Sequence, residues 1–231
     1  MLKLKYILKR IILKLPFGFR FNQIIRSILL LRERSFRDLF FEVKRKDICL
    51  DLGANIGDAS LVMWFKGVRF IYALEPNIEV FNILNNNLRG IRNFKALNIA
   101  ISSESSTQKL YLHKSILDKS DKKKILEFSQ ASSLMADKSN LGNCFYEIKT
   151  KNFKDLFDSF EKKPNIIKCD IEGGEYIIYE QLIELAKQPQ VRKIFVECHA
   201  EKYPQYIDLH NDFIRSIKEN NLRNKFRTDW H

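Results

Sequence analysis

Acidic side chains end three short apolar runs of this 231-residue sequence. Asp51, Glu75 and Asp170 each stand at the position where such a run stops. Carboxylates at the carboxyl ends of parallel strands can accept hydrogen bonds from an amine or from hydroxyl groups, and one of them can take up a proton. These acids therefore predict a ligand site at one edge of a sheet.

A glycine loop follows the first acid and indicates which ligand the site would take. The loop reads Gly53-Ala-Asn-Ile-Gly57, so it has two glycines as G-x-x-x-G. A dinucleotide fingerprint has three, as G-x-G-x-x-G, and places a pyrophosphate at the helix N-terminus. Asp51 would repel a pyrophosphate but could accept hydrogen bonds from an ammonium group. The pattern favours S-adenosylmethionine, which has an amine and a sulfonium but no phosphate. The alternative is a plain turn after a core strand.

The second acid supports the same ligand. Glu75 lies 24 positions after Asp51, and in dinucleotide folds an acid about 20 residues on binds the ribose hydroxyls. Pro76 ends the strand, and Asn77 can cap the helix that follows. The alternative is a surface glutamate with no ligand.

Five apolar runs have the length of buried strands and alternate with helical patterns. The expected strands are residues 48–50, 69–75, 94–100, 165–170 and 191–197, the expected helices begin near residues 58, 77, 171 and 206, and a final strand is expected within 226–231. This alternation predicts an α/β, Rossmann-like fold with a mostly parallel sheet and helices on both faces.

Residues 101–163 form a long insertion between the third and fourth expected strands. Residues 108–113 and 145–150 alternate like half-exposed strands, and Asn152 opens a short helical pattern that runs to residue 160. The stretch 115–143 has the composition of turns and loops, with a floppy surface loop expected at 119–124. At the carboxyl edge of a nucleotide-binding sheet, such an insertion is expected to be a substrate-binding lid.

Most of the net charge of +12 belongs to residues 1–46, which carry 13 Lys and Arg against three acids. Residues 1–15 predict a basic amphipathic helix, and a second helical stretch starts at Ile24. This N-terminal arm could lie on an anionic membrane surface at the inner face of the membrane. Alternatively, its helices pack on the domain formed by residues 47–231 and leave their basic faces in solvent.

The composition excludes several classes of protein. No run approaches the ~20 apolar residues of a transmembrane helix, and no small-residue cleavage site follows the basic N-terminal stretch, which argues against a secretory signal. The cysteines form no C-x-x-C pair, which fits a reducing, cytoplasmic compartment and argues against a metal–thiolate site; they are Cys49, Cys144, Cys169 and Cys198.

Six segments together resemble the FkbM family of S-adenosylmethionine-dependent methyltransferases. They read DLGANIGDAS, ALEPN, NIAISS, ASSL, IKCDIEGGEY and FVECH, and they occur in the family's order between residue 47 and about residue 200. The resemblance implies a class I methyltransferase fold with one antiparallel strand near the end, and O-methylation of sugar hydroxyls in glycans, glycolipids or glycosylated metabolites. The sequence departs from the family pattern at the C-terminus, which has little room for two well-formed final strands.

The resemblance also assigns roles to individual residues. It implies contacts with the methionine part of the cofactor for Asp51, Gly53, Asn55 and Gly57; a ribose site at Glu75, walled by Pro76 and Asn77; and an adenine site near Ala100 and Ile101. The family's D-x-E-G-x-E motif falls on Asp170, Glu172 and Glu175.

Methyl transfer to a hydroxyl requires the hydroxyl to be aligned and its proton removed. Asp170 is the first candidate for the base, or for a ligand to a divalent ion that lowers the hydroxyl's pKa. His199 is the second candidate, because the unperturbed pKa of histidine suits general-base work near neutrality. Glu172 is a further candidate in catalysis or metal binding. The alternative is that Glu172 and Glu175 only favour the N-terminus of the next helix.

Two other functions stay open from the sequence. The basic arm would suit an RNA 2′-O-ribose methyltransferase, whose acceptor is also a sugar hydroxyl. Base-modifying enzymes are disfavoured because the sequence has neither an Asn-Pro-Pro-Tyr motif nor a Pro-Cys pair, so a nucleic-acid partner is not the main expectation. A non-catalytic S-adenosylmethionine-binding module is the second alternative, although the three retained acids argue against a decayed site.

Overall fold

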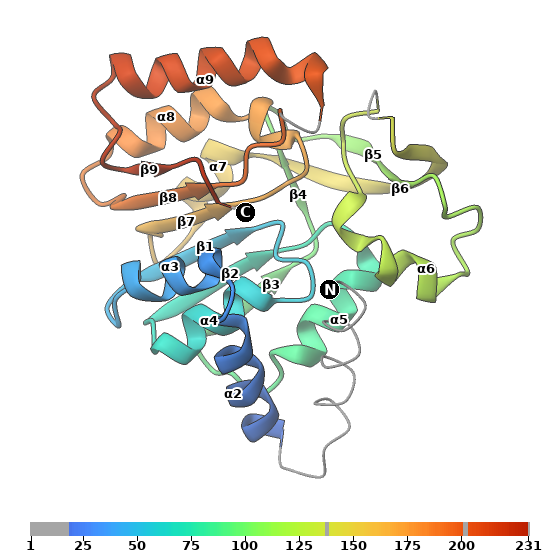
Figure 1. Ribbon diagram of the computed structural model, residues 1–231, viewed down its shortest axis with the longest axis horizontal. Helices are drawn as coiled ribbons and strands as arrows, with labels where there is room; N and C mark the ends of the chain where they lie inside the picture. The colour runs from blue at the N-terminus through green and yellow to red at the C-terminus, as the bar shows by residue number, and fades with distance from the viewer. Residues whose placement is uncertain (1–18, 137–138, 201–202, 231) are drawn as a thin grey trace.

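The computed structural model describes residues 19–136, 139–200 and 203–230, and its centre is a six-stranded sheet (Figure 1). The strand order is β3-β2-β1-β7-β8-β9, and all the pairings within this sheet are parallel. The strands are β1 (Ile48–Leu52), β2 (Phe70–Leu74), β3 (Phe94–Leu97), β7 (Ile166–Cys169), β8 (Lys193–Val196) and β9 (Phe226–Arg227). The order reverses between β1 and β7, which creates the crevice where open α/β sheets bind ligands. The predicted Rossmann-like fold is confirmed.

Helices cover both faces of this sheet because alternate residues of its strands bury in two separate cores. Leu50 and Leu52 of β1 pack in one core, whereas Cys49 packs in the other. The first core lies under α7 (Phe153–Ser159), α8 (Tyr179–Lys187) and α9 (Ile207–Glu219), and the second lies under α3 (Arg34–Glu42), α4 (Asp58–Lys66) and α5 (Ile78–Asn87). Burial on both faces explains why these strands read as continuous apolar runs.

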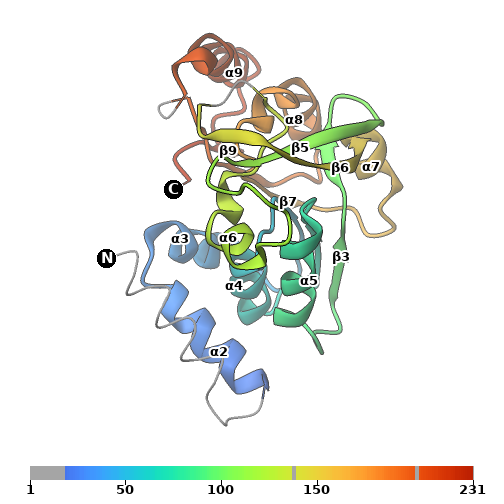
Figure 2. The same cartoon turned by 90° about the vertical axis from the view of Figure 1, so that its right-hand side faces the viewer.

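A second, three-stranded sheet stands at the carboxyl edge of the first (Figures 1 and 2). It consists of β4 (Ala100–Ser102), β6 (Leu141–Asn152) and β5 (Thr107–His113), in that order. The strand expected over residues 94–100 is therefore divided between the two sheets. Asn98 lies at the division, where its side-chain amide donates to the backbone carbonyls of Glu75 and Pro76 at 2.8 and 2.9 Å.

The segment between β5 and β6 contains more regular structure than its composition predicts. Helix α6 (Lys122–Glu127) and the short 3₁₀ helix η1 (Ser129–Ala131) replace much of the expected loop. The Asp121 carboxylate accepts a hydrogen bond from the Lys124 backbone N–H at 3.0 Å, and Ile125 is buried. A capped turn with one buried apolar residue thus corrects the prediction of a floppy loop at residues 119–124.

The part of the N-terminal arm that the structure describes packs on the domain. Helices α2 (Phe19–Leu30) and α3 both contact α4, and the Arg26 guanidinium pairs with Asp58 at 2.5 Å. The amphipathic helix predicted for residues 1–15 lies outside the described residues. Among the helices that are described, none is both long enough and apolar enough to cross a membrane.

The C-terminal segment joins the sheet and α3. Strand β9 pairs in parallel with β8, and antiparallel contact in this region is limited, in the described residues, to one bridge between Glu197 and Asp229. The antiparallel strand that the family resemblance implies near the end is therefore not formed as such. The Trp230 ring packs edge-on against Phe36 with ring centroids 5.8 Å apart, and Arg227 pairs with Asp38 at 2.7 Å.

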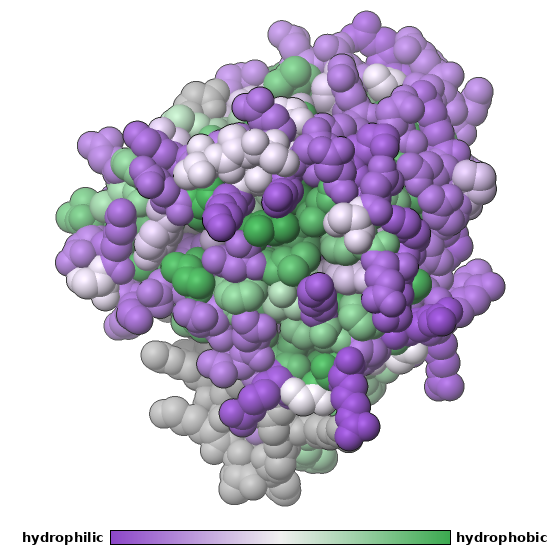
Figure 3. Space-filling view, turned by 180° about the vertical axis from the view of Figure 1, so that it is seen from behind, coloured by the Kyte–Doolittle hydropathy of each residue, from purple (hydrophilic) through white to green (hydrophobic). Residues whose placement is uncertain are grey.

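Hydrophilic residues dominate the back of the molecule, with hydrophobic ones gathered toward its middle (Figure 3). On α2, large apolar side chains are exposed at positions spaced by three and four residues, namely Phe21, Ile24 and Ile28 at 46, 37 and 51%. This spacing places them on one face of the helix. The described part of the arm therefore carries an exposed apolar stripe.

Candidate functional site

A cavity of about 260 Å³ opens at the crevice between β1 and β7. Its walls come from the loop after β1, the ends of β2, β7 and β8, strand β4, and the segment around η1. Polar and charged residues at its surface include Asn55, Glu75, Ser129, Gln130, Ser132, Ser133, Asp170, Glu172 and Glu197. The topology thus brings acids from the ends of three strands, β2, β7 and β8, which are distant in the sequence, to one opening.

The loop after β1 must be glycine at its first position. Gly53 has φ +69°, and a Cβ there would lie 1.8 Å from the backbone carbonyl oxygen of Asp170. The loop also places Asn55 in the left-handed region, with φ +50°. The close approach of this loop to the end of β7 forms the floor of the cavity, where Gly53 and Asn55 line the surface.

Glu75 is held for hydrogen bonding at one end of the cavity. Its two carboxylate oxygens accept from the backbone N–H groups of Asn55 and Asn77, each at 2.9 Å. Burial raises the pKa of Glu75 to about 7, because the backbone hydrogen bonds offset only part of the cost of desolvating its charge. A carboxylate fixed in this way fits a ligand with neighbouring hydroxyl groups, such as a ribose.

The predicted residues around Glu75 divide into two groups. Pro76, Ala100 and Ile101 line the cavity, as a ribose and adenine site requires. Asn77 is buried outside the lining, and its side chain caps α5 by accepting from the Glu79 N–H at 3.1 Å. Gly57 is also outside the lining and is buried against Leu84.

Asp51 does not reach the cavity. Its side chain is fully buried, the Ser60 hydroxyl donates to it at 2.7 Å, and the Lys168 ammonium lies 3.4 Å away. Burial raises the pKa of Asp51, while Lys168 and Ser60 act in the opposite direction. In this structure the Asp51 side chain therefore contacts Ser60 of α4 and Lys168 of β7, whereas the sequence predicted direct contact with the cofactor's amine.

Lys168, a residue that no sequence motif indicated, lies between the carboxylates of Asp51 and Asp170. Its Nζ donates to the Gly53 carbonyl at 2.9 Å and lies 3.3 Å from Oδ2 of Asp170. Burial alone would lower the pKa of Lys168, but Asp170 and Asp51 raise it above its usual value, so the ammonium stays charged. The sequence did contain one indication of this role. Lys168 lies inside an otherwise apolar strand, and a charged side chain is rarely buried without a partner.

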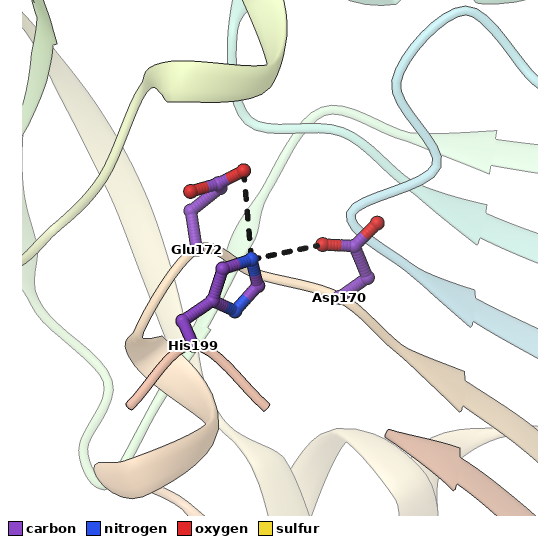
Figure 4. A group of neighbouring side chains, drawn as sticks. All are labelled: Asp170, Glu172 and His199. Atoms are coloured by element: carbon purple, nitrogen blue, oxygen red, sulfur yellow. Dashed lines mark ion pairs between the residues drawn. The ribbon is translucent and has the colours of Figure 1, made fainter. Parts of the chain in front are cut away.

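His199 is not in the lining of the cavity but lies behind the acids that are, next to Asp170 and Glu172 (Figure 4). Its ring is fully buried, and Nδ1 lies 2.7 Å from Oε1 of Glu175. Its Nε2 points toward three further carboxylates, 3.6 Å from Glu172, 3.7 Å from Glu197 and 3.9 Å from Asp170. Within the described part of the chain, Nε2 has no hydrogen-bond partner.

These surroundings change the acid–base character of His199. Burial would lower its pKa, but Glu172 and Glu175 raise it to about 10. The imidazole is therefore protonated near neutrality when no cation is present, and it has no free lone pair with which to take a proton. The expectation of a neutral histidine base rested on an ordinary pKa, which these carboxylates change.

The insertion is fixed against the two ends of the cavity. The Asn55 side-chain amide donates to the Ser129 hydroxyl at 3.1 Å, and the Ser133 hydroxyl donates to the Glu172 backbone carbonyl at 2.6 Å. Glu172 itself has a left-handed backbone, with φ +55°, which is uncommon for a residue with a side chain and is seen often at functional sites. The segment 129–134 thus forms a wall whose position depends on both motif loops.

One family model matches most of the chain. It is described as the methyltransferase FkbM domain, and it covers residues 51–223. The search of curated proteins gave no match. The matched range includes the glycine loop, Glu75, the insertion and the whole carboxylate group around His199.

Proposed function

Because this chain belongs to the FkbM methyltransferase family, we propose that it is an S-adenosylmethionine-dependent O-methyltransferase acting on a sugar hydroxyl. The acceptor would belong to a bacterial glycan, glycolipid or glycosylated metabolite. The observation that carries the proposal is that one cavity holds a fixed carboxylate, Glu75, at one end and the acids around His199 at the other. Such a cavity offers separate places for a nucleoside and for an acceptor.

The residues present fit the cofactor. Glu75 would accept hydrogen bonds from the ribose hydroxyls, the Gly53–Asn55 backbone would contact the methionine part, and Ala100 and Ile101 would give an apolar wall for the adenine. When bound, the cofactor supplies a methyl group on a sulfonium, which is an electrophile with a neutral leaving group.

Asp170 would receive the proton that the acceptor hydroxyl gives up as its oxygen takes the methyl group. Its carboxylate is 27% exposed at the cavity, and Lys168 holds one of its oxygens. The side chains of Ser129, Gln130 and Ser132 line the same cavity. They could donate and accept hydrogen bonds with the remaining hydroxyls of a sugar.

Glu75→Ala should weaken S-adenosylmethionine binding at least tenfold, about 1.4 kcal/mol, as measured by calorimetric titration. Glu79→Ala is the matched control, because it removes a nearby carboxylate on α5 that does not line the cavity. Glu75 also accepts from two backbone N–H groups, so circular dichroism must show that the variant is folded. Equal affinities for folded Glu75→Ala and wild type would contradict the assignment.

The pKa of Glu75 gives the same measurement a pH dependence. Since the folded carboxyl titrates at about 7, it is ionised, and a better acceptor for ribose hydroxyls, above that pH. Wild-type affinity should therefore rise between about pH 6 and about pH 8 more than that of Glu75→Gln, which does not titrate; the cofactor's own amine contributes equally to both. The sign for stability is opposite: an unfolded carboxyl titrates near 4.5, so this group's contribution to stability falls as pH rises from 4.5 to 7.

An acceptor screen with isotopically labelled cofactor tests the reaction. Labelled methyl on nucleotide sugars, lipid-linked sugars or oligosaccharides, at oxygen, would support the proposal. Label on the 2′-oxygen of RNA would favour the nucleic-acid alternative, and cofactor binding without transfer to any acceptor would favour a non-catalytic module.

We also propose that the enzyme works in the cytoplasm and that its arm contacts an anionic membrane surface. The supporting features are the basic charge of residues 1–46 and the exposed apolar stripe on α2. Wild type should sediment with vesicles containing anionic lipid, and Ile28→Asp should reduce the bound fraction several-fold. Leu117→Asp, at an 83% exposed position outside the arm, is the control. Equal sedimentation of both variants, or of wild type with purely zwitterionic vesicles, would contradict the proposal.

A further inference from the structure

Nε2 of His199 is one of the buried side-chain atoms in the described structure that have no hydrogen-bond partner. It faces the carboxylates of Asp170 and Glu172 (Figure 4) and that of Glu197. Buried polar atoms are nearly always satisfied, so an exception at a functional site calls for an explanation. We propose that Nε2 of His199 and the carboxylates of Asp170, Glu172 and Glu197 together bind one divalent transition-metal ion.

The distances fit shared coordination better than hydrogen bonding. Nε2 lies 3.6, 3.7 and 3.9 Å from oxygens of Glu172, Glu197 and Asp170, beyond the usual 2.7–3.2 Å of an N–H···O bond. Two ligands each about 2.1 Å from one ion are separated by roughly 3.0 to 3.6 Å at angles between 90 and 120°. The atoms of Asp170, Glu172 and His199 all lie within 4.8 Å of one another. Side-chain movements would bring these atoms onto a common ion, and Glu197, which is outside this group, would have to move furthest.

Glu175 holds the ring of His199 in an orientation suited to metal binding. Its Oε1 lies 2.7 Å from Nδ1 of His199, and its Oε2 accepts from the Gly173 N–H at 2.9 Å. With one proton held on Nδ1, an incoming ion would displace the proton of Nε2 and bind the nitrogen lone pair on the side that faces the carboxylates. Metal-ligating histidines commonly donate their other N–H to a carboxylate in this way, which fixes the ring and increases its basicity.

The negative charge around the histidine is also compatible with a bound cation. Four carboxylates surround one imidazole, from the end of β7, the loop after it, η2 (Gly174–Tyr176) and the end of β8; they are Asp170, Glu172, Glu175 and Glu197. Lys168 is the cation that approaches this group from β7, and it is shared with Asp51. Buried charges are expensive unless they are paired or coordinate a metal. A divalent ion would neutralise two of the excess negative charges.

The donor set indicates the class of ion. Three carboxylate oxygens and one imidazole nitrogen suit Mn²⁺, Fe²⁺ or Zn²⁺, whereas Mg²⁺ and Ca²⁺ prefer oxygen donors alone. Asp170, Glu172 and Glu197 also line the cavity, so the ion would have an open position facing it. If the proposed O-methyltransferase function holds, an acceptor hydroxyl bound there would lose its proton more readily to Oδ2 of Asp170, because Oδ1, which faces Nε2 of His199, is the oxygen that would hold the ion.

Metal binding can be measured without any acceptor. Purified full-length protein, treated with a chelator and then dialysed, is titrated with Mn²⁺ while the free-ion signal is followed by electron paramagnetic resonance. Wild type should bind one equivalent, and Glu172→Gln and Glu197→Gln should each weaken binding at least tenfold. Glu79→Gln, outside the carboxylate group, is the matched control and should bind as wild type does. Coupling of the bound Mn²⁺ to an imidazole nitrogen should be visible and should disappear in His199→Gln.

The outcomes separate this inference from the proposed function. Absence of a bound equivalent, unchanged affinity in folded Glu172→Gln and Glu197→Gln, or no nitrogen coupling in wild type would each overturn the metal site. If methyl transfer continues in the presence of a chelator, the proposed function holds but the reaction does not depend on the ion. A bound ion in a protein that does not bind S-adenosylmethionine would uphold the site and overturn the proposed function. If His199→Gln fails to fold, the two glutamine variants and the wild-type spectrum still decide the matter.

Discussion

Gly53→Ala is expected to lower the free energy of unfolding by about 3–5 kcal/mol, enough to unfold a marginally stable chain. The added Cβ would lie 1.8 Å from the carbonyl oxygen of Asp170 and 2.9 Å from its carbonyl carbon. Both are backbone atoms of the β7 end, so they cannot move aside as a flexible side chain would. The clash adds to a left-handed φ of +69°, which costs a residue with a side chain about 1–2 kcal/mol. Urea denaturation followed by circular dichroism measures the loss.

Gly90→Ala separates the clash from the backbone conformation. Gly90 also has a positive φ, +83°, but a Cβ there would meet nothing within 4 Å. Its substitution should therefore cost only the conformational part, about 1–2 kcal/mol. If the two alanine variants lost equal stability, the close contact between the glycine loop and β7 would be disproved.

Asp170→Asn is expected to reduce turnover by about 10²- to 10⁴-fold, the usual contribution of a positioned proton acceptor. Asparagine keeps the size of the side chain and an oxygen for Lys168, which lies 3.3 Å from Oδ2, but it cannot take up a proton from the acceptor. Cofactor affinity should change little, because the fixed carboxylate of Glu75 is at the other end of the cavity. The measurement is the turnover number on the acceptor that the labelled-cofactor screen identifies.

Asp212→Asn is the control for that variant. Asp212 is on α9, where it forms an exposed ion pair with Arg215, and such pairs contribute little to stability. Turnover should match wild type. If Asp170→Asn kept full activity, another group of the cavity would have to accept the proton. Glu172 and Glu197 are further acids that line the cavity.

The fold was predictable because its signals are local. The inner strands β1, β2, β7 and β8 are buried on both faces, so residues such as Leu50 and Ile167 belong to continuous apolar runs that can be recognised without knowing their neighbours in space. Because parallel strands end at one edge, the predicted acids at the ends of β2 and β7 both line the cavity. Asn152 likewise caps α7 as expected, through a bond to the Asp155 N–H.

The details that the sequence did not predict depend on contacts between distant segments. From the sequence, Asp51 is expected to face a ligand. In the structure, Lys168, 117 residues later on the neighbouring strand, lies beside it. The expected strand over residues 94–100 is interrupted by hydrogen bonds from Asn98 to the Glu75 turn. The pKa of His199 depends on Glu172 and Glu175 from another loop. No local pattern contains these pairings.

The contact between α3 and the C-terminal segment has a consequence for how the chain is made. Asp38 and its partner Arg227 are 189 residues apart, so at 5–20 residues per second the ribosome needs about 10 to 40 s to produce the second after the first. During that interval Trp230, against which Phe36 packs in the folded protein, has not yet been synthesised. Helix α3 therefore spends much of translation with part of its apolar face uncovered. Helix α3 acquires its final packing late in synthesis, and slowing elongation should lengthen the time in which chaperones can bind it.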